Sequence, residues 1–234
     1  MHIGKRLETI AGMVPQGSIL ADIGTDHAYL PVWLLKNGCI KSAVAGDIAA
    51  GPCQAARNTV AANNMQNLVQ VRMGSGLEVI KIGEVDCITI AGMGASTIIS
   101  ILEANFSVAA SAKLLVLQPM AGAASLRRWL CNNGWQLVDE ELVDDEPHFY
   151  EIIAASRGIS EKYSEAEYFI GPVLLKKRHN LLTKQINRQV MLCRQLLANM
   201  ELSESAKASS KYAELRALQA ALEVLQNDEN CNCK

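Results

Sequence analysis

The sequence has few aromatic residues, 5% of its 234 positions, so a core must be built mainly from aliphatic side chains. It also lacks a long hydrophobic run. The longest uncharged stretch, Cys87–Leu102, contains glycines and hydroxyl residues, and a transmembrane helix needs about 20 apolar residues. The first 20 residues include Lys5, Arg6 and Glu8 and have no apolar block typical of a signal peptide. We therefore expect no membrane association.

The seven cysteines form no CxxC pair, and an odd number does not suit a disulfide framework. The four histidines are dispersed without metal-ligand spacing, so no metal site is predicted. We expect a reduced, cytoplasmic protein. With 50% hydrophobic residues and a net charge of −2, the composition is that of a globular protein. It excludes collagen-like, mucin-like and wholly disordered classes.

Short, mostly apolar runs alternate with helical patterns up to about residue 155, which is typical of a parallel sheet covered by helices. The predicted strands are Ile19–Ile23, Ser42–Asp47, Leu68–Arg72, Asp86–Ile90 and Lys113–Gln118. The predicted helices are Ala28–Asn37, Pro52–Asn64, Ala95–Ala104 and Ala123–Asn132. Trp135–Val143 and Phe149–Ala155 then flank an acidic turn and predict an antiparallel hairpin. The fold class is a Rossmann-like α/β sheet of seven strands.

The strand pattern stops after this hairpin. A small, polar linker leads to a predicted helix from about Glu165 to Met200, and a second helix is marked by leucines at helical spacing. We expect a helical hairpin or coiled coil. The predicted domains are 1–157 and 158–234, with a disordered tail over Gln226–Lys234.

No acidic residue occurs between Glu167 and Glu201, and this segment carries six positive charges. The basic residues are Lys176, Lys177, Arg178, Lys184, Arg188 and Arg194. Such a run is either a solvated helix face or a surface for a polyanion such as RNA.

The first predicted strand ends in Asp22-Ile23-Gly24 and turns directly into a helix. Ligands of doubly wound sheets bind at such strand ends, and Gly24 lets the backbone approach a ligand closely. The next strand ends at Asp47, whose carboxylate could take the hydroxyls of a ribose. A dinucleotide would need G-x-G-x-x-G, but Asp26 and Tyr29 stand at the later glycine positions.

The charge pattern favours a different nucleoside cofactor. S-adenosylmethionine has no phosphate and carries an ammonium and a sulfonium, which suit carboxylates at positions 22 and 26. The plain alternative is that these two residues only cap helices. Three further segments follow predicted strands and share the same edge of the sheet: Gly74–Leu77, Ala91–Gly94 and Gln118–Met120. As ordinary turns they would need no ligand, but their common location favours a site.

The chain resembles the bacterial tRNA adenine N1-methyltransferases that modify position 22. The resemblance is carried by Ala21–Pro31 (ADIGTDHAYLP), Gly51-Pro52, Gly74–Ile80, Ile88–Gly94 (ITIAGMG), Leu117–Pro119 and Tyr150–Ile152. It covers roughly Lys5 to Ala155, and the helical tail matches only in kind. Three positions depart from the family pattern, with Ser75 for Asp, Ala95 for Gly and Met120 for Asn.

The resemblance implies a class I methyltransferase that transfers a methyl group from S-adenosylmethionine to N1 of an adenine in tRNA. The expected cofactor-binding residues are Asp22, Gly24, Thr25, Asp26, His27, Asp47, Ile48, Ser75, Gly76, Ala91, Gly92 and Met93. Asp26 is the first candidate for catalysis and His27 the second, while Tyr29 is expected to pack. The expected tRNA-binding residues are Lys5, Arg6, Lys176, Lys177, Arg178, Lys184 and Arg188.

Two other functions stay open from the residues alone. A methyltransferase acting on a small molecule would not need the basic helices. A non-catalytic RNA- or protein-binding module would use the helical hairpin and would bind no cofactor. No obligate protein partner is indicated, although the apolar stripes of the hairpin also allow two copies to pair.

Overall fold

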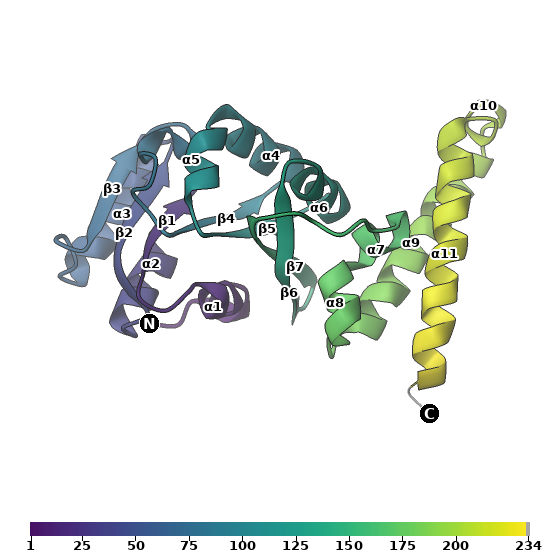
Figure 1. Cartoon of the computed structure of the whole chain (residues 1–234), viewed down its shortest axis with the longest axis horizontal. Coiled ribbons are helices and arrows are strands. Elements are labelled where there is room, and N and C mark those ends of the chain that lie inside the picture. Colours follow the sequence, from purple (N-terminus) through teal and green to yellow (C-terminus); the bar gives the residue numbers. More distant parts are fainter. Residues whose placement is uncertain (233–234) are drawn as a thin grey trace. The chain divides into compact units, whose positions relative to one another are not determined.

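The structure is a computed structural model that describes the backbone of residues 1–232 and the side chains of residues 1–228 (Figure 1). Its contacts divide the chain into two compact units, Met1–Glu161 and Lys162–Lys234. This division falls four residues after the end of the predicted first domain, 1–157. Among the described helices, none is long and apolar enough to span a bilayer.

The first unit contains one seven-stranded sheet with the order β3-β2-β1-β4-β5-β7-β6. The strands are β1 (Ser18–Ile23), β2 (Ile40–Asp47), β3 (Val69–Met73), β4 (Cys87–Met93), β5 (Leu114–Pro119), β6 (Trp135–Asp145) and β7 (His148–Arg157). Strands β1 to β5 are parallel, and β7 is antiparallel to both neighbours. The predicted fold class and all seven predicted strands are confirmed. The strand order reverses between β1 and β4, which is where such sheets bind ligands.

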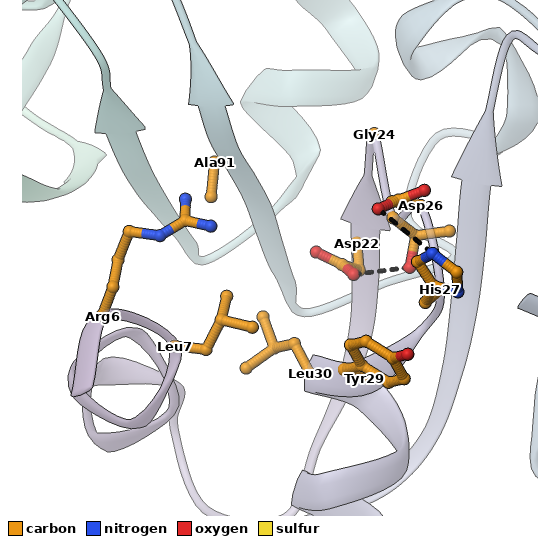
Figure 2. Close-up of a pocket in the computed structure, with 10 residues that line it drawn as sticks. Arg6, Leu7, Asp22, Gly24, Asp26, His27, Tyr29, Leu30 and Ala91 are labelled. Carbon is orange, nitrogen blue, oxygen red and sulfur yellow. Dashed lines mark hydrogen bonds and ion pairs between the residues drawn. The ribbon is translucent and has the colours of Figure 1, made fainter. Parts of the chain in front are cut away.

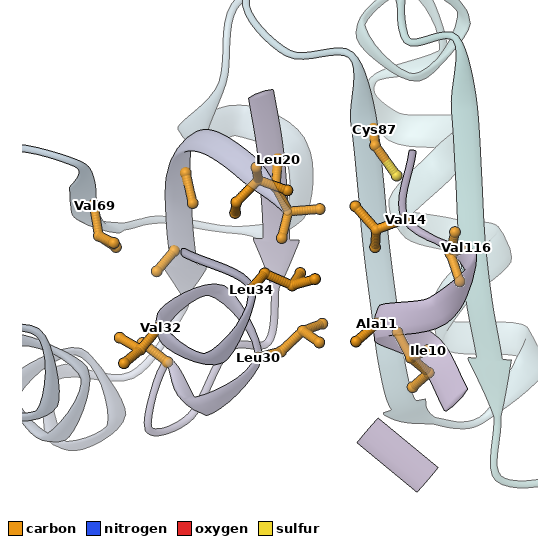
Figure 3. Close-up of a cluster of buried hydrophobic side chains, with 14 of the residues drawn as sticks. Ile10, Ala11, Val14, Leu20, Leu30, Val32, Leu34, Val69, Cys87 and Val116 are labelled. Carbon is orange, nitrogen blue, oxygen red and sulfur yellow. The ribbon is translucent and has the colours of Figure 1, made fainter. Parts of the chain in front are cut away.

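Helices cover both faces of this sheet (Figure 1). They are α1 (Gly4–Met13), α2 (Tyr29–Lys36), α3 (Ala50–Ala62), the 3-10 helix η1 (Gly76–Val79), α4 (Ala95–Ala104), α5 (Phe106–Ser111) and α6 (Ala123–Asn132). The four predicted helices correspond to α2, α3, α4 and α6, whereas α1 and α5 were not predicted. Figure 3 shows Ile10 and Ala11 of α1 beside Val116 of β5 in the aliphatic core. This contact fixes α1 on the sheet.

In the second unit, the prediction of one helix over Glu165–Met200 is wrong. The segment forms α7 (Glu165–Ile170), α8 (Pro172–Lys177) and α9 (Leu182–Glu201). The first break occurs because Gly171 has φ +112° and Pro172 has no backbone N–H for the preceding turn. The second break occurs at Arg178, which has a left-handed backbone conformation.

The second unit contains the predicted hairpin, formed by α9 and α11 (Ser210–Asn232), with the short α10 (Glu204–Lys207) at the turn. Leu218 and Leu222 of α11 are buried. Residues 226–232, which were predicted to belong to a disordered tail, continue α11 in the structure, and Gln226 Nε2 donates to Asn187 Oδ1 at 2.7 Å across the hairpin. Cys233 and Lys234 lie outside the described residues.

Candidate active site

The turn after β1 is fixed to the end of β2 by backbone hydrogen bonds. The N–H groups of Gly24 and Thr25 donate to Gly46 O at 2.8 and 3.1 Å. The next N–H, of Asp26, donates to Asp47 Oδ2 at 3.3 Å. The residues predicted to bind the cofactor after β1 and at the end of β2 therefore lie next to one another.

Gly24 also brings the end of β4 to this turn. Its φ is +74°, and a Cβ at this position would collide with the methyl group of Met93. A side chain at this position would be strained by the positive φ and would require the Met93 methyl group to move. The side chain of Met93 therefore packs against the turn at Gly24.

Asp22 is the buried acid of the site, with 6% of its surface exposed. Its Oδ2 accepts from the Thr25 hydroxyl at 2.6 Å, and its Oδ1 accepts from the Thr89 hydroxyl at 2.7 Å. Burial raises the pKa of Asp22, while these two hydrogen bonds and the charge of Arg6 act in the opposite direction. A cation bound next to Asp22 would favour its ionised form.

Figure 2 shows the pocket next to Asp22. Its lining residues are Arg6, Leu7, Asp22, Gly24, Thr25, Asp26, His27, Tyr29, Leu30 and Ala91. Six of these were predicted to bind the cofactor, and Arg6 was predicted to bind tRNA. Leu7, Tyr29 and Leu30 were missed. Tyr29 and Leu30 stand inside the ADIGTDHAYLP motif, which was a signal for them, whereas Leu7 depends on the unpredicted α1.

The loop between β1 and α2 exposes two polar side chains and one aromatic ring. Asp26 and Ala28 have φ of +52° and +55°, unusual for residues other than glycine. The side chain of Asp26 is 69% exposed, and its Oδ2 lies 3.6 Å from His27 Nε2. The Tyr29 ring stacks on His27 with centroids 5.0 Å apart. Tyr29 is 43% exposed, so only part of the ring packs against the protein.

The other predicted cofactor residues lie at neighbouring strand ends outside the pocket lining. Ile48 follows β2 with its side chain exposed, and Ser75 lies exposed between β3 and η1. Gly76 has φ +52° and is packed against Ile101. Gly92 follows the buried part of β4 and donates its N–H to Gln118 Oε1 at 3.1 Å.

The two predicted tRNA-binding residues of α1 differ in environment. Arg6 is half-buried and lines the pocket, while Lys5 is exposed and lies 3.9 Å from Asp145. The predicted residues of the second unit, Lys176, Lys177, Arg178 and Lys184, are exposed, and Arg188 is half-buried. The two groups belong to separate units.

The carboxylates of the pocket suit a cationic nucleoside cofactor. A dinucleotide would bring its pyrophosphate toward the carboxylates of Asp22 and Asp26, whereas S-adenosylmethionine would bring positive charge. Within the described residues, no cluster of three His, Cys, Asp or Glu could hold a metal ion. Together with the sheet order, this site defines a class I S-adenosylmethionine-dependent methyltransferase.

Comparison with known proteins gives the family. Residues 20–226 match the family described as tRNA (adenine(22)-N(1))-methyltransferase. A Bacillus subtilis (strain 168) protein of that name is 33% identical over 231 residues, which cover 97% of this chain and 96% of the relative. The chain belongs to this family.

Two solved structures agree with this assignment. The B. subtilis M1A22 tRNA methyltransferase TrmK has a TM-score of 0.86 and 33% identity, with 96% of this chain and 99% of that chain covered. A Streptococcus pneumoniae protein in complex with S-adenosyl-L-methionine has a TM-score of 0.81 and 35% identity, with 96% and 100% covered. The present chain is an enzyme that methylates N1 of adenine 22 in tRNA and uses S-adenosylmethionine.

Proposed function

We propose that the exposed carboxylate of Asp26 faces the acceptor adenine, and that Asp22 and Asp47 hold the cofactor. The observation that carries this proposal is the contrast between the acids of one pocket. Asp22 is buried beneath two threonine hydroxyls, whereas Asp26 is exposed on a loop of unusual conformation. Non-glycine residues persist in such conformations where the surrounding structure holds them, often at functional sites.

The reaction makes the adenine cationic, because N1 gains a methyl group. Bound S-adenosylmethionine supplies that methyl group from its sulfonium. Asp26 stabilises the positive charge that develops on the ring and accepts a hydrogen bond from the exocyclic amine. His27 acts as a positioning residue, since its Nε2 lies 3.6 Å from Asp26 Oδ2 and its ring stacks on Tyr29.

The tRNA body is proposed to bind the basic residues of α8 and α9. Lys176, Lys177 and Arg178 are consecutive and exposed at the end of α8, and Lys184 is exposed on α9. Positive side chains on helices bind phosphates of structured RNA without reading its sequence. We further propose that the enzyme acts in the cytoplasm, where tRNA is found, and needs no obligate protein partner.

The purified chain, radiolabelled S-adenosylmethionine and an unmodified tRNA transcript test this proposal. Wild type should form 1-methyladenosine without any added protein. Asp26→Asn should lower kcat by about 10²–10³, as expected for one electrostatic contact made in the transition state. Its affinity for S-adenosylhomocysteine should stay within about threefold of wild type.

Glu161→Gln is the matched control, because it removes an exposed carboxylate outside the pocket. Its kcat should equal that of wild type. If Asp26→Asn instead loses cofactor affinity in proportion to its loss of activity, Asp26 holds the cofactor and does not face the adenine.

A further inference from the structure

Met120 is an exposed apolar residue at the edge of the sheet that carries the pocket. It directly follows β5, and 51% of its surface is exposed. The pocket lies at the carboxyl ends of the parallel strands, and β5 pairs with β4 in the same sheet. The position of Met120 therefore makes its thioether a candidate contact for a ligand at this edge.

The backbone places Met120 close to the loop that carries Asp26. The N–H of Met120 donates to Met93 O at 2.8 Å, which joins the end of β5 to the end of β4. The side chain of Met93 in turn packs against Gly24, two residues before Asp26. In Figure 2, Asp26 lies beside Gly24 and on the other side of the pocket from Arg6. A chain of direct contacts therefore connects Met120 with the turn that precedes Asp26.

The thioether of Met120 is held by a buried amide. Gln118 is fully buried, and its Nε2 lies 3.7 Å from Met120 Sδ and donates to Pro119 O at 2.9 Å. Its Oε1 accepts from Gly92 N at 3.1 Å and from Arg6 Nη1 at 2.7 Å. The amide cannot turn without breaking these bonds. Met120 is thus a half-exposed side chain that is fixed through its sulfur.

The acceptor base approaches Asp26 from the side of Met120. The proposed function places the cofactor at Asp22 and Asp47, over the ends of β1 and β2, and β4 and β5 lie on the other side of β1. The acceptor base therefore reaches Asp26 over β4 and β5. Adenine 22 must also leave its stack in the tRNA to expose N1, which costs stacking energy. A thioether contacts aromatic rings favourably and offsets part of this cost.

We infer that the thioether of Met120 packs against the acceptor adenine and holds the extruded base next to Asp26. This contact rests on the proposed function, in which Asp26 faces the same base, and it adds an apolar surface to that site. Position 120 is Asn in the family pattern. The present chain therefore offers the base an apolar contact where an amide would offer hydrogen bonds.

A tRNA transcript with 2-aminopurine at position 22 tests the contact without turnover. The fluorescence of this base rises when it leaves the RNA stack, and S-adenosylhomocysteine occupies the cofactor site. Wild type at saturating concentration should produce the rise. Met120→Ala should lower the ratio of extruded to stacked base about 3- to 10-fold, because it removes the thioether. With unmodified tRNA, kcat/KM should fall by a similar factor. The salt dependence of tRNA binding should stay unchanged, since no phosphate contact is lost.

Two further variants separate the apolar contact from other effects. Met120→Leu keeps most of the apolar surface but loses the sulfur, so both readouts should lie between those of wild type and Met120→Ala. Ile82→Ala is the matched control, because Ile82 is 67% exposed and precedes β4, at the opposite end of the sheet. It should behave as wild type. Thermal melting of each variant checks that the fold is kept, and the affinity for S-adenosylhomocysteine should stay within about twofold of wild type.

The outcomes distinguish this contact from the role of Asp26. Asp26→Asn should lower kcat but leave the fluorescence rise unchanged, because 2-aminopurine has no amine at C6. If Asp26→Asn keeps full activity while Met120→Ala lowers both readouts, the role of Asp26 fails and the contact of Met120 stands. The inference is overturned if Met120→Ala matches wild type in fluorescence and kcat/KM, or if wild type produces no rise. It is also overturned if Met120→Ala weakens S-adenosylhomocysteine binding as much as it lowers kcat/KM, since Met120 would then belong to the cofactor site.

Discussion

The buried carboxylate of Asp22 favours binding of a cation but lowers the stability of the free protein. It is buried, and burial raises its pKa above the ordinary value of 3.8 despite two hydroxyl donors. The folded protein must therefore hold a carboxylate whose ionised form is poorly solvated. A bound cation would offset this cost, which is a reason to find such an acid at a binding site rather than in a structural core.

Asp22→Asn should stabilise the free protein and weaken cofactor binding. Because the folded pKa is raised, the folded state binds more protons than the unfolded state above about pH 3.8, and stability falls as pH rises from there to the folded pKa. Asparagine does not titrate, and its amide can donate to Thr89 while the Thr89 hydroxyl turns to Ala21 O, which it already approaches at 3.3 Å.

A gain of about 1 kcal/mol would raise Tm by about 3 °C at pH 7.5. The gain should be smaller at pH 4, and the affinity for S-adenosylhomocysteine should fall more than tenfold. Differential scanning calorimetry between pH 4 and 8 measures the first effect. A variant that melts below wild type at pH 7.5 would mean that the ionised carboxylate stabilises the fold.

The strands could be predicted from the sequence because each is a short apolar run that ends at a local turn signal. The turn after β1 was found for the same reason, since Asp22, Gly24 and Asp26 are close together in the chain. Helix α1 was missed, and with it the place of Arg6, because its packing on β5 joins segments about 100 residues apart. The Gly171-Pro172 pair itself indicates a break in the helix. The regular spacing of apolar residues on both sides of it favoured one continuous helix instead.

Helix α6 is joined to the β6–β7 hairpin by a buried ion-pair cluster. Arg127 is fully buried, and its Nε donates to Glu140 Oε1 at 2.5 Å. Its Nη2 donates to Glu151 Oε2 at 2.8 Å. Coulombic attraction from these two carboxylates raises the pKa of Arg127 against the effect of burial. Glu151 is the neighbour of Tyr150 in β7, and Arg6 lies against the ring of Tyr150.

Arg127→Met should lower the free energy of unfolding by about 3–5 kcal/mol, because it leaves a buried carboxylate without its cation. Urea unfolding at pH 7.5 measures this decrease, with Arg57→Met as the surface control. The triple variant R127M/E140L/E151L should recover most of it, since an apolar replacement of a whole buried cluster is often neutral. A single variant as stable as the control would show that the cluster contributes little.

The charges of the second unit are only partly available to a ligand. Arg194 is paired with Glu223 across the hairpin, with Nη2 and Oε1 2.7 Å apart, and this pair lowers the pKa of Glu223. It therefore serves the hairpin, and it was not among the predicted tRNA-binding residues. Lys176, Lys177 and Arg178 are consecutive positive residues whose side chains are exposed.

The triple variant K176Q/K177Q/R178Q separates RNA binding from methyl-donor binding. For every phosphate that the variant no longer binds, the slope of log Kd for tRNA against log salt concentration should fall by about 0.7–0.9, so three phosphates would reduce it by about 2–3. KM for tRNA should rise while kcat and the affinity for S-adenosylhomocysteine stay unchanged. The matched control, K36Q/R57Q/K81Q, removes the same charge from positions of the first unit. If both triples reduce the slope equally, net charge alone explains the effect, and α8 is a solvated surface rather than a tRNA-binding one.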